Sequence, residues 1–284
     1  MNIGFSLWLF AVSFGASALG GMLGMASGIF IVPILLTFGG VDIHTAIGAS
    51  IVSVIACSCG SAAPFLRERL TNIRLAIVLE VATTLGALTG VLLSGLLPIA
   101  ALYVLFAAIL LLSARQMLAR RGDPAAAPVQ AGQRRWAALD ASYPDRGLGR
   151  DILYRVDRLP MGMGLMYAAG LVSALLGIGS GVLKIPAMDT ALRLPIKVSS
   201  ATSNFMIGVT AAASAGAYFV RGAIAAPIAG PVALGSVAGA ALGARILMRV
   251  SNERLRLLFV IVLVALAVQM LLGAFGIDLL RGAA

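Results

Sequence analysis

Long uncharged apolar segments constrain this chain more than any other feature. A helix that crosses a bilayer needs about 20 such residues. Of the 284 residues, 60% are hydrophobic and 11% are charged, whereas a soluble domain has about 45–50% and about 25%. Seven segments carry no charge: Met1–Val41, Ala46–Leu66, Ile99–Ala114, Leu159–Leu183, Val198–Val220, Ala223–Ala244 and Leu257–Ile277. An eighth, Leu75–Leu97, is interrupted only by Glu80. The sequence therefore predicts an all-α polytopic integral membrane protein.

The net charge of +10 would suggest nucleic-acid binding in a soluble domain. Here the basic residues gather between the apolar segments and in one long polar stretch, where lysine and arginine set the orientation of membrane helices. We therefore expect the lipid bilayer as a partner and no nucleic acid. No lysine or arginine precedes Arg67, so the N-terminal segment lacks the basic start of a signal peptide and is expected to stay in the fold.

The chain contains an internal repeat with an offset of 153 residues, which aligns Leu23–Leu118 with Leu176–Leu271 without a gap. Identical residues at matching positions include the pairs Gly24 and Gly177, Ser27 and Ser180, Gly28 and Gly181, Pro33 and Pro186, Ser50 and Ser203, Gly86 and Gly239, and Gly90 and Gly243. Such self-similarity indicates two copies of one structural unit. We predict a first transmembrane repeat over residues 1–118, a cytoplasmic linker over 119–158 and a second transmembrane repeat over 159–284.

Each repeat begins with an apolar stretch that glycines interrupt. The run Ile3–Phe38 would be about 54 Å long as one straight helix, against a hydrocarbon core of about 30 Å. Its middle, residues 20–28, is rich in glycine, which costs about 1 kcal/mol per residue in a helix interior. We predict a broken helix there, and a second one at residues 177–181. Each repeat then adds three transmembrane helices.

The basic residues predict that the two repeats are inverted relative to each other. If the nine arginines from Arg115 to Arg158 are cytoplasmic, an inverted arrangement places 18 of the 21 lysines and arginines inside. Only Arg221 and Arg281 then lie outside, with Lys184 in the membrane. A parallel arrangement would move six basic residues of the second repeat outside, against the positive-inside rule.

Paired broken helices in inverted repeats are the architecture in which secondary transporters hold substrate near the membrane midplane. A break exposes backbone N–H groups and a partial positive charge, and both favour an anion. The candidate ligands at the two breaks are Gly24, Ser27, Gly28, Gly177, Ser180 and Gly181. The alternative is that these small residues only allow close helix packing. Two breaks at matching positions favour binding.

Lys184 is an ionisable residue inside an apolar segment, and such residues are functional candidates because burying them is costly. We predict that it neutralises an oxyanion; the alternative is a lysine that snorkels to the interface. Hydroxyl and amide groups are dense in the segment that follows, and they suit an oxyanion or a coupling cation. The candidates there are Lys197, Ser199, Ser200, Thr202, Ser203 and Asn204. Capping of a helix by Ser199 or Ser200 is the alternative.

Glu80 is the acid within a predicted span and is a candidate proton-coupling group. An interfacial ion pair with the nearby Arg74 is the alternative, and Asp189 is a weaker candidate. Cys57 and Cys59 lie about 200° apart on a helix, a poor geometry for a disulfide. We interpret both cysteines as packing residues.

These motifs resemble the TauE/SafE family, also described as toluene-sulfonate uptake permeases. The resemblance rests on two Gly-x-x-Ser-Gly-x4-Pro segments, at Gly24–Pro33 and Gly177–Pro186, on the Lys-x-Ser-Ser-Ala-Thr-Ser stretch at Lys197–Ser203, and on the duplicated layout. It covers nearly the whole chain outside residues 119–158. It implies transport of sulfite, sulfoacetate or organosulfonates across a bacterial cytoplasmic (inner) membrane. Many members carry more consecutive glycines where this chain has Met25-Ala26-Ser27.

We therefore predict a secondary transporter of a small oxyanion, sulfite or an organosulfonate, with a midplane site between the two broken helices. Alternating access would be coupled to a proton or sodium ion. No enzymatic activity, catalytic residue, cofactor or metal is expected. Two alternatives stay open. A passive anion channel would lack saturable flux that counter-substrate stimulates, and an intramembrane thiol-disulfide electron carrier would need a reactive cysteine in each repeat.

Overall fold

The computed structural model describes residues 3–25, 27–93, 99–119, 136–145, 150–176, 181–220, 222 and 224–274. The helices are α1 (Ile3–Leu23), α2 (Gly28–Thr37), α3 (Ile43–Arg67), α4 (Ile73–Leu93), α5 (Ile99–Ala119), α6 (Leu159–Leu176), α7 (Gly181–Thr190), α8 (Ile196–Val220), α9 (Ala226–Arg249) and α10 (Asn252–Ala274). A 3-10 helix, η2 (Ala137–Leu139), and two strands, β1 (Ala141–Asp145) and β2 (Arg150–Tyr154), complete the described elements.

Four of the described helices are long and apolar enough to cross a membrane. They cover Ile3–Leu23, Thr45–Arg67, Ile73–Gly90 and Ala226–Arg249. Many large apolar side chains on their outer faces are exposed, for example Leu7, Leu92 and Leu234, as expected where lipid takes the place of water. The chain is therefore a helical membrane protein, as its composition predicts.

The first apolar stretch is broken at the glycine-rich segment. Helix α1 ends at Leu23 and α2 begins at Gly28. Between them Gly24 adopts a φ of +69°. This left-handed conformation costs residues with a Cβ atom about 1–2 kcal/mol. In the second apolar stretch α6 ends at Leu176 and α7 begins at Gly181, and residues 177–180 lie outside the described residues.

Glycines allow two helix pairs to pack with their backbones almost in contact. Helix α1 packs along α9, and α4 packs along α6. A Cβ atom on Gly239 would lie 2.1 Å from the carbonyl oxygen of Phe14, and one on Gly86 would lie 2.0 Å from that of Tyr167. Close backbone approach at small residues is the usual way in which membrane helices associate. Gly86 and Gly239, which the repeat offset pairs, therefore serve helix packing.

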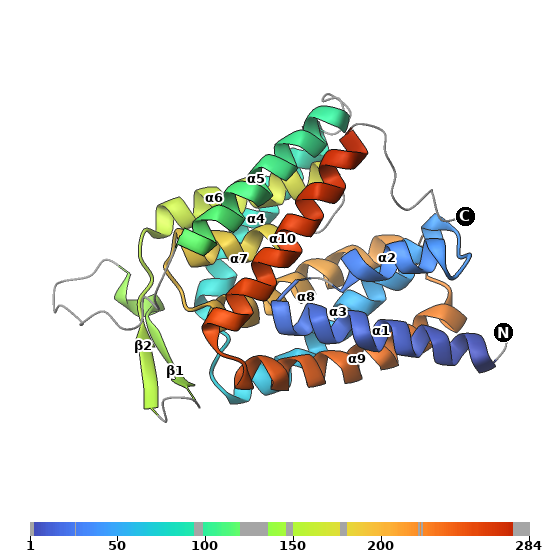
Figure 1. The fold of residues 1–284 in the computed structure, drawn as a ribbon, viewed down its shortest axis with the longest axis horizontal. Coiled ribbons are helices and arrows are strands. Elements are labelled where there is room, and N and C mark those ends of the chain that lie inside the picture. The colour runs from blue at the N-terminus through green and yellow to red at the C-terminus, as the bar shows by residue number, and fades with distance from the viewer. Residues whose placement is uncertain are drawn as a thin grey trace.

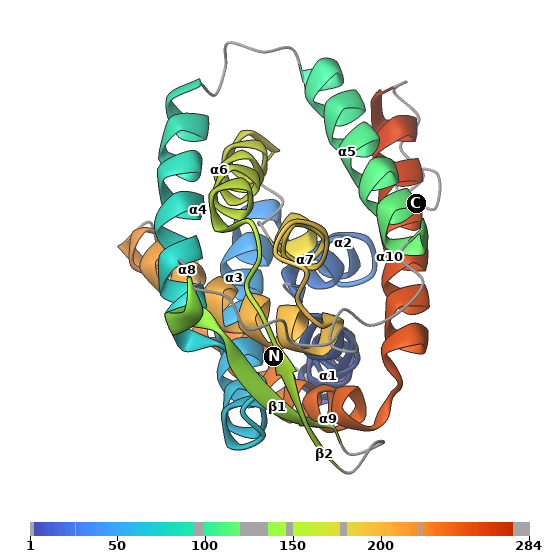
Figure 2. The same cartoon turned by 90° about the vertical axis from the view of Figure 1, so that its left-hand side faces the viewer.

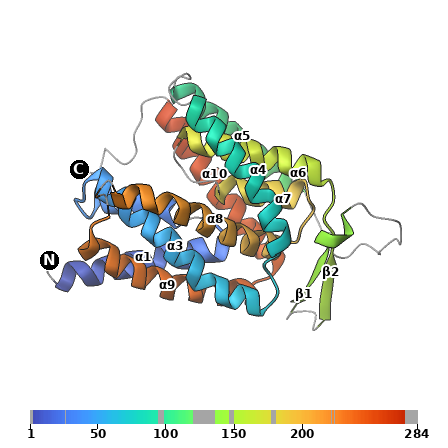
Figure 3. The ribbon, with the colours of Figure 1, turned by 180° about the vertical axis from the view of Figure 1, so that it is seen from behind.

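The short helix α7 lies in the middle of the bundle. Figure 2 shows it between the α4–α6 pair on one side and the α5–α10 pair on the other. Helix α8 packs against α3 and α7. Helices α1, α3 and α9 lie on the side of the molecule that faces away from α5 (Figures 1 and 3). Residues Val182 to Asp189 of α7 are all buried. Any charged group on α7 is therefore held inside the protein.

The predicted linker contains an ordered β-hairpin, which the sequence analysis did not predict. Strands β1 and β2 pair antiparallel, and the hairpin projects from one end of the molecule (Figure 1). The strand residues Tyr143 and Tyr154 are both buried. Asn72 Nδ2, in the α3–α4 loop, donates to the carbonyl oxygen of Leu139 at 2.8 Å. The segment that leads into the hairpin is therefore docked on the helical bundle through this loop.

Candidate functional site

The break between α1 and α2 packs directly on α8. A Cβ atom on Gly24 would lie 2.3 Å from the carbonyl oxygen of Ser200. Ser203 Oγ donates to the carbonyl oxygen of Gly24 at 2.9 Å, and Asn204 Nδ2 donates to that of Gly21 at 3.4 Å. The structure thus brings together the first break and the polar segment of the second half, which the sequence predicts as parts of one site.

Besides Ser203, two of the candidate polar side chains on α8 have protein partners. Asn204 Nδ2 also donates to Ser61 Oγ at 2.7 Å, and its carbonyl oxygen accepts from Ser58 Oγ at 2.9 Å. Thr202 Oγ1 accepts from the backbone N–H of Asn72 at 3.2 Å. These bonds fix α8 against α3 and the α3–α4 loop, so both residues hold the site in place.

Ser199 and Ser200 differ from their neighbours. Both are 0% exposed, and among the described residues neither hydroxyl has a hydrogen-bond partner. Helix α8 begins at Ile196, so both serines lie within its first turns rather than at the N-cap, and the capping alternative is wrong. An unsatisfied buried hydroxyl costs about 1–3 kcal/mol. Lys197 is also buried in this first turn.

Lys184 is enclosed in the protein and paired with Glu80. Its side chain is 0% exposed, and Nζ lies 2.9 Å from Oε2 of Glu80 on α4. Thr210 Oγ1 on α8 donates to the other carboxylate oxygen, Oε1. The snorkelling alternative for Lys184 is therefore wrong. The predicted alternative pair of Glu80 with Arg74 is also wrong, because Arg74 Nη1 donates to the carbonyl oxygen of Ala138 at 3.3 Å.

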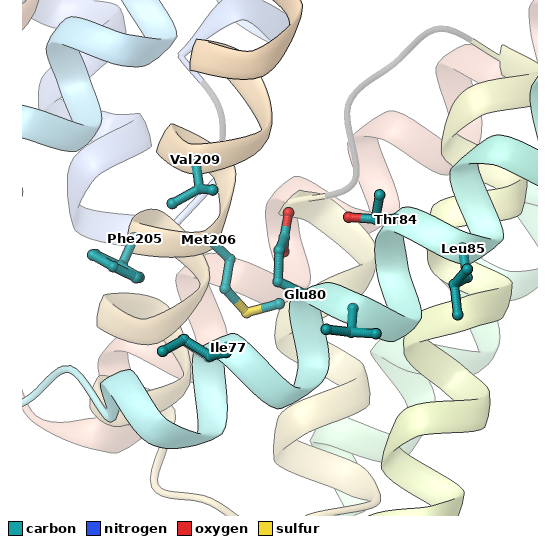
Figure 4. Close-up of a pocket in the computed structure, with 9 residues that line it drawn as sticks. Ile77, Glu80, Thr84, Leu85, Phe205, Met206 and Val209 are labelled. Atoms are coloured by element: carbon teal, nitrogen blue, oxygen red, sulfur yellow. The ribbon is translucent and has the colours of Figure 1, made fainter.

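The Glu80 carboxylate faces a cavity of about 390 Å³ between α4 and α8 (Figure 4). Apart from Glu80 and Thr84 its walls are apolar, with Ile77, Val81, Leu85, Phe205, Met206 and Val209 among the lining residues. Thr210 follows Ser203 by seven residues, which is about 10 Å along a helix. Helix α8 therefore contacts the α1–α2 break near its start and the ion pair further along.

A second buried ion pair holds the other end of α7. Asp189 is 0% exposed, and its Oδ1 lies 3.4 Å from Nη2 of Arg256 on α10. The sequence analysis counted Arg256 among the 18 basic residues on the inside and missed this pair. Its position between the apolar residues Leu255 and Leu257 was the available signal. The two ion pairs connect α7 to α4 and to α10.

Ser27 belongs to a different polar cluster. Its Oγ lies 2.8 Å from Ser53 Oγ, which in turn lies 2.7 Å from Ser236 Oγ. Ser17 Oγ is 3.5 Å from Ser53, and all four side chains are buried. The sequence analysis predicted Ser27 alone of this set. The cluster joins the break to α3 and α9, so the structure does not place the Ser27 hydroxyl on α8.

The remaining candidates are placed as follows. Gly28 begins α2, and a Cβ there would lie 2.2 Å from Ser50 Oγ. Gly181 is the buried first residue of α7, whereas Gly177 and Ser180 lie outside the described residues. Cys57 is buried and Cys59 is exposed, and both are free thiols. This agrees with the expectation that they do not form a disulfide.

A bundle of apolar helices with a broken first helix and buried ion pairs within it defines an integral membrane protein with a polar interior site. The chain belongs to the sulfite exporter TauE/SafE family, which matches residues 9–270. It is 23% identical over 263 residues to the probable membrane transporter protein YunE of Bacillus subtilis (strain 168), a match that covers 90% of this chain and 93% of the relative. No solved structure matches it. Both names indicate a membrane transporter rather than an enzyme.

Proposed function

We propose that this protein is a multi-pass secondary transporter of a small oxyanion, sulfite or an organosulfonate, in a bacterial cytoplasmic membrane. One observation carries the proposal. Among the described residues, the buried hydroxyls of Ser199 and Ser200 have no hydrogen-bond partner, and they lie on the part of α8 against which Gly24 packs. Buried donors of this kind are stabilised when a ligand accepts from them.

The surroundings of these hydroxyls favour an anion. They lie in the first turns of a 25-residue helix, whose N-terminus carries a partial positive charge. Lys197 adds a full positive charge in the same turn. Lys184, on the neighbouring α7, lies further along α8 beside Glu80 and Thr210, and it contributes a second charge on the substrate path once its contact with Glu80 is released. Oxyanions accept several hydrogen bonds, so hydroxyl donors in the same turns as Lys197 suit them.

The packing of the helices supports two inverted repeats. Helices α3 and α8, and likewise α2 and α7, begin and end at residues that differ by the repeat offset of 153. The same offset relates α1 to α6 and α4 to α9, and the pair α1–α9 is matched by the pair α6–α4. Each first helix thus packs on a helix of the other half. We propose that the halves rock against each other to alternate access, with the linker in the cytoplasm.

Transport of labelled sulfite and methanesulfonate into proteoliposomes tests this proposal. We expect saturable uptake that counter-substrate inside the vesicle stimulates, which separates a carrier from a channel. A double variant, Ser199→Ala with Ser200→Ala, is expected to abolish uptake without lowering the unfolding temperature, because no protein hydrogen bond is lost. The control Ser203→Ala removes the bond to Gly24 and is expected to lower that temperature. Uptake at the wild-type rate by the double variant, or none by wild type under a pH or sodium gradient, contradicts the proposal.

A further inference from the structure

We infer that the coupling ion is the proton and that Glu80 carries it: the substrate anion and the Glu80 carboxylate compete for Lys184, and Glu80 takes up one proton when the anion binds. The inference rests on the proposed function and specifies its energy source. It follows from three features of the ion pair, namely the enclosure of Lys184, the occupancy of both Glu80 oxygens and the access to Glu80.

Lys184 depends on Glu80 for charge compensation. Its side chain is completely enclosed, and Glu80 is the carboxylate that contacts it among the described residues. A buried ammonium is tolerated when it is paired, and removal of the partner is strongly destabilising. A substrate anion could supply the same compensation. Lys184 can therefore release Glu80 without penalty only when an anion takes its place.

Both oxygens of the Glu80 carboxylate are already engaged. Lys184 holds Oε2 and the hydroxyl of Thr210 holds Oε1. If an anion joined Lys184 while Glu80 stayed ionised, two negative charges would face one positive charge in a medium of low dielectric constant, which is costly. Protonation of Glu80 removes this excess: a proton from solution bonds to the carboxylate, and the neutral acid remains beside Thr210. The site then has one positive and one negative charge, as before.

Glu80 is the member of the pair that can exchange a proton with its surroundings. Its side chain is 14% exposed and lines the cavity between α4 and α8, whereas Lys184 is 0% exposed. Lys184 on α7 and Thr210 on α8 face the Glu80 carboxylate from the neighbouring helices. On α6, the titratable Tyr167 has its backbone against Gly86 further along α4. On α4 itself, Arg74 bonds to Ala138. Asp189, a buried acid on α7, is 0% exposed and held by Arg256.

Proteoliposomes that contain an entrapped pH indicator test this inference, with labelled methanesulfonate as the probe. A sulfonate stays ionised across the working pH range, so any proton that moves with it belongs to the protein. We expect one proton per anion in wild type. The concentration for half-maximal uptake is expected to rise about tenfold per pH unit once Glu80 is ionised, because binding is then linked to one proton. Labelled sulfite is run in parallel. The proton movement that comes from the titration of sulfite itself is measured with the Glu80→Gln variant and subtracted from the wild-type value.

Glu80→Gln is expected to carry the anion without protons and with an affinity that no longer depends on pH. Thr84→Val, which changes the same cavity wall one turn further along α4, is expected to keep the wild-type coupling. With methanesulfonate, anion flux without protons in wild type, or proton movement that persists in Glu80→Gln, overturns the inference and leaves the proposed function standing. If wild type carries neither anion, both fail. If Glu80→Gln does not fold, the wild-type proton count and pH slope decide alone.

Discussion

Ser203 donates a hydrogen bond from its hydroxyl to the backbone carbonyl of Gly24 at 2.9 Å, although 179 positions separate the two residues in the chain. The same glycine has a φ of +69° and lies against the backbone of Ser200. The first helix break of the protein is therefore seated on the helix that carries the unpartnered hydroxyls. A change at this contact is expected to alter the fold and the proposed anion site together.

Gly24→Ala is expected to reduce the amount of folded protein. The left-handed conformation costs alanine about 1–2 kcal/mol, and the clash of its Cβ with Ser200 adds about 1–3 kcal/mol. Gly40→Ala is the matched control, because Gly40 also has a positive φ, +59°, but nothing lies within 4 Å of its Cβ position. Thermal unfolding in detergent measures both. Equal unfolding temperatures for the two variants would show that the contact with Ser200 carries no energetic weight.

Arg256→Met is expected to destabilise the protein by about 3–5 kcal/mol, because it leaves the buried Asp189 carboxylate without this ion pair. The double variant Asp189→Asn with Arg256→Met removes both charges and is expected to recover most of that loss. Unfolding temperatures of the single and double variants provide the comparison. A single variant as stable as wild type would mean that α10 does not hold α7 through this pair.

Burial raises the pKa of Tyr154, in the hairpin, from 10.0 to about 12. The folded protein therefore keeps this phenol protonated where the unfolded chain has already lost the proton. Its contribution to stability is complete below pH 10 and is lost as the pH rises to about 12. A difference titration of phenolate absorbance between wild type and Tyr154→Phe measures the pKa. Ionisation of Tyr154 at its ordinary pKa would show that the hairpin does not bury it.

Local features of the sequence predict the helix breaks and the ionisable groups, whereas their partners depend on packing. The glycine-rich segment predicts the break between α1 and α2 because glycine weakens a helix wherever it occurs. Lys184 is conspicuous because a charge inside an apolar run is costly. Its partner Glu80 is 104 positions away, and sequence reasoning weighed the neighbouring Arg74 instead. Only the packing of α4, α7 and α8 decides between them.

The hairpin and the serine cluster were missed for a similar reason. Tyr143 and Tyr154 lie in strands of five residues, which are too short to distinguish from a polar linker. Ser53 and Ser236 lie in apolar segments far apart in the chain, and serine is common at helix contacts. Their grouping becomes visible once α3 and α9 are packed together. Pairwise contacts between distant helices are what a single sequence does not specify.

The most direct test of the account is transport by the double variant Lys184→Met with Glu80→Met. Two apolar residues that replace a buried ion pair commonly leave stability unchanged or increased, so the variant is expected to unfold at or above the wild-type temperature. Its sulfite and methanesulfonate uptake is expected to fall about a hundredfold, because an ionic contact with the substrate is worth about 3 kcal/mol. A folded double variant that carries either anion at the wild-type rate would make the ion pair purely structural and contradict the account.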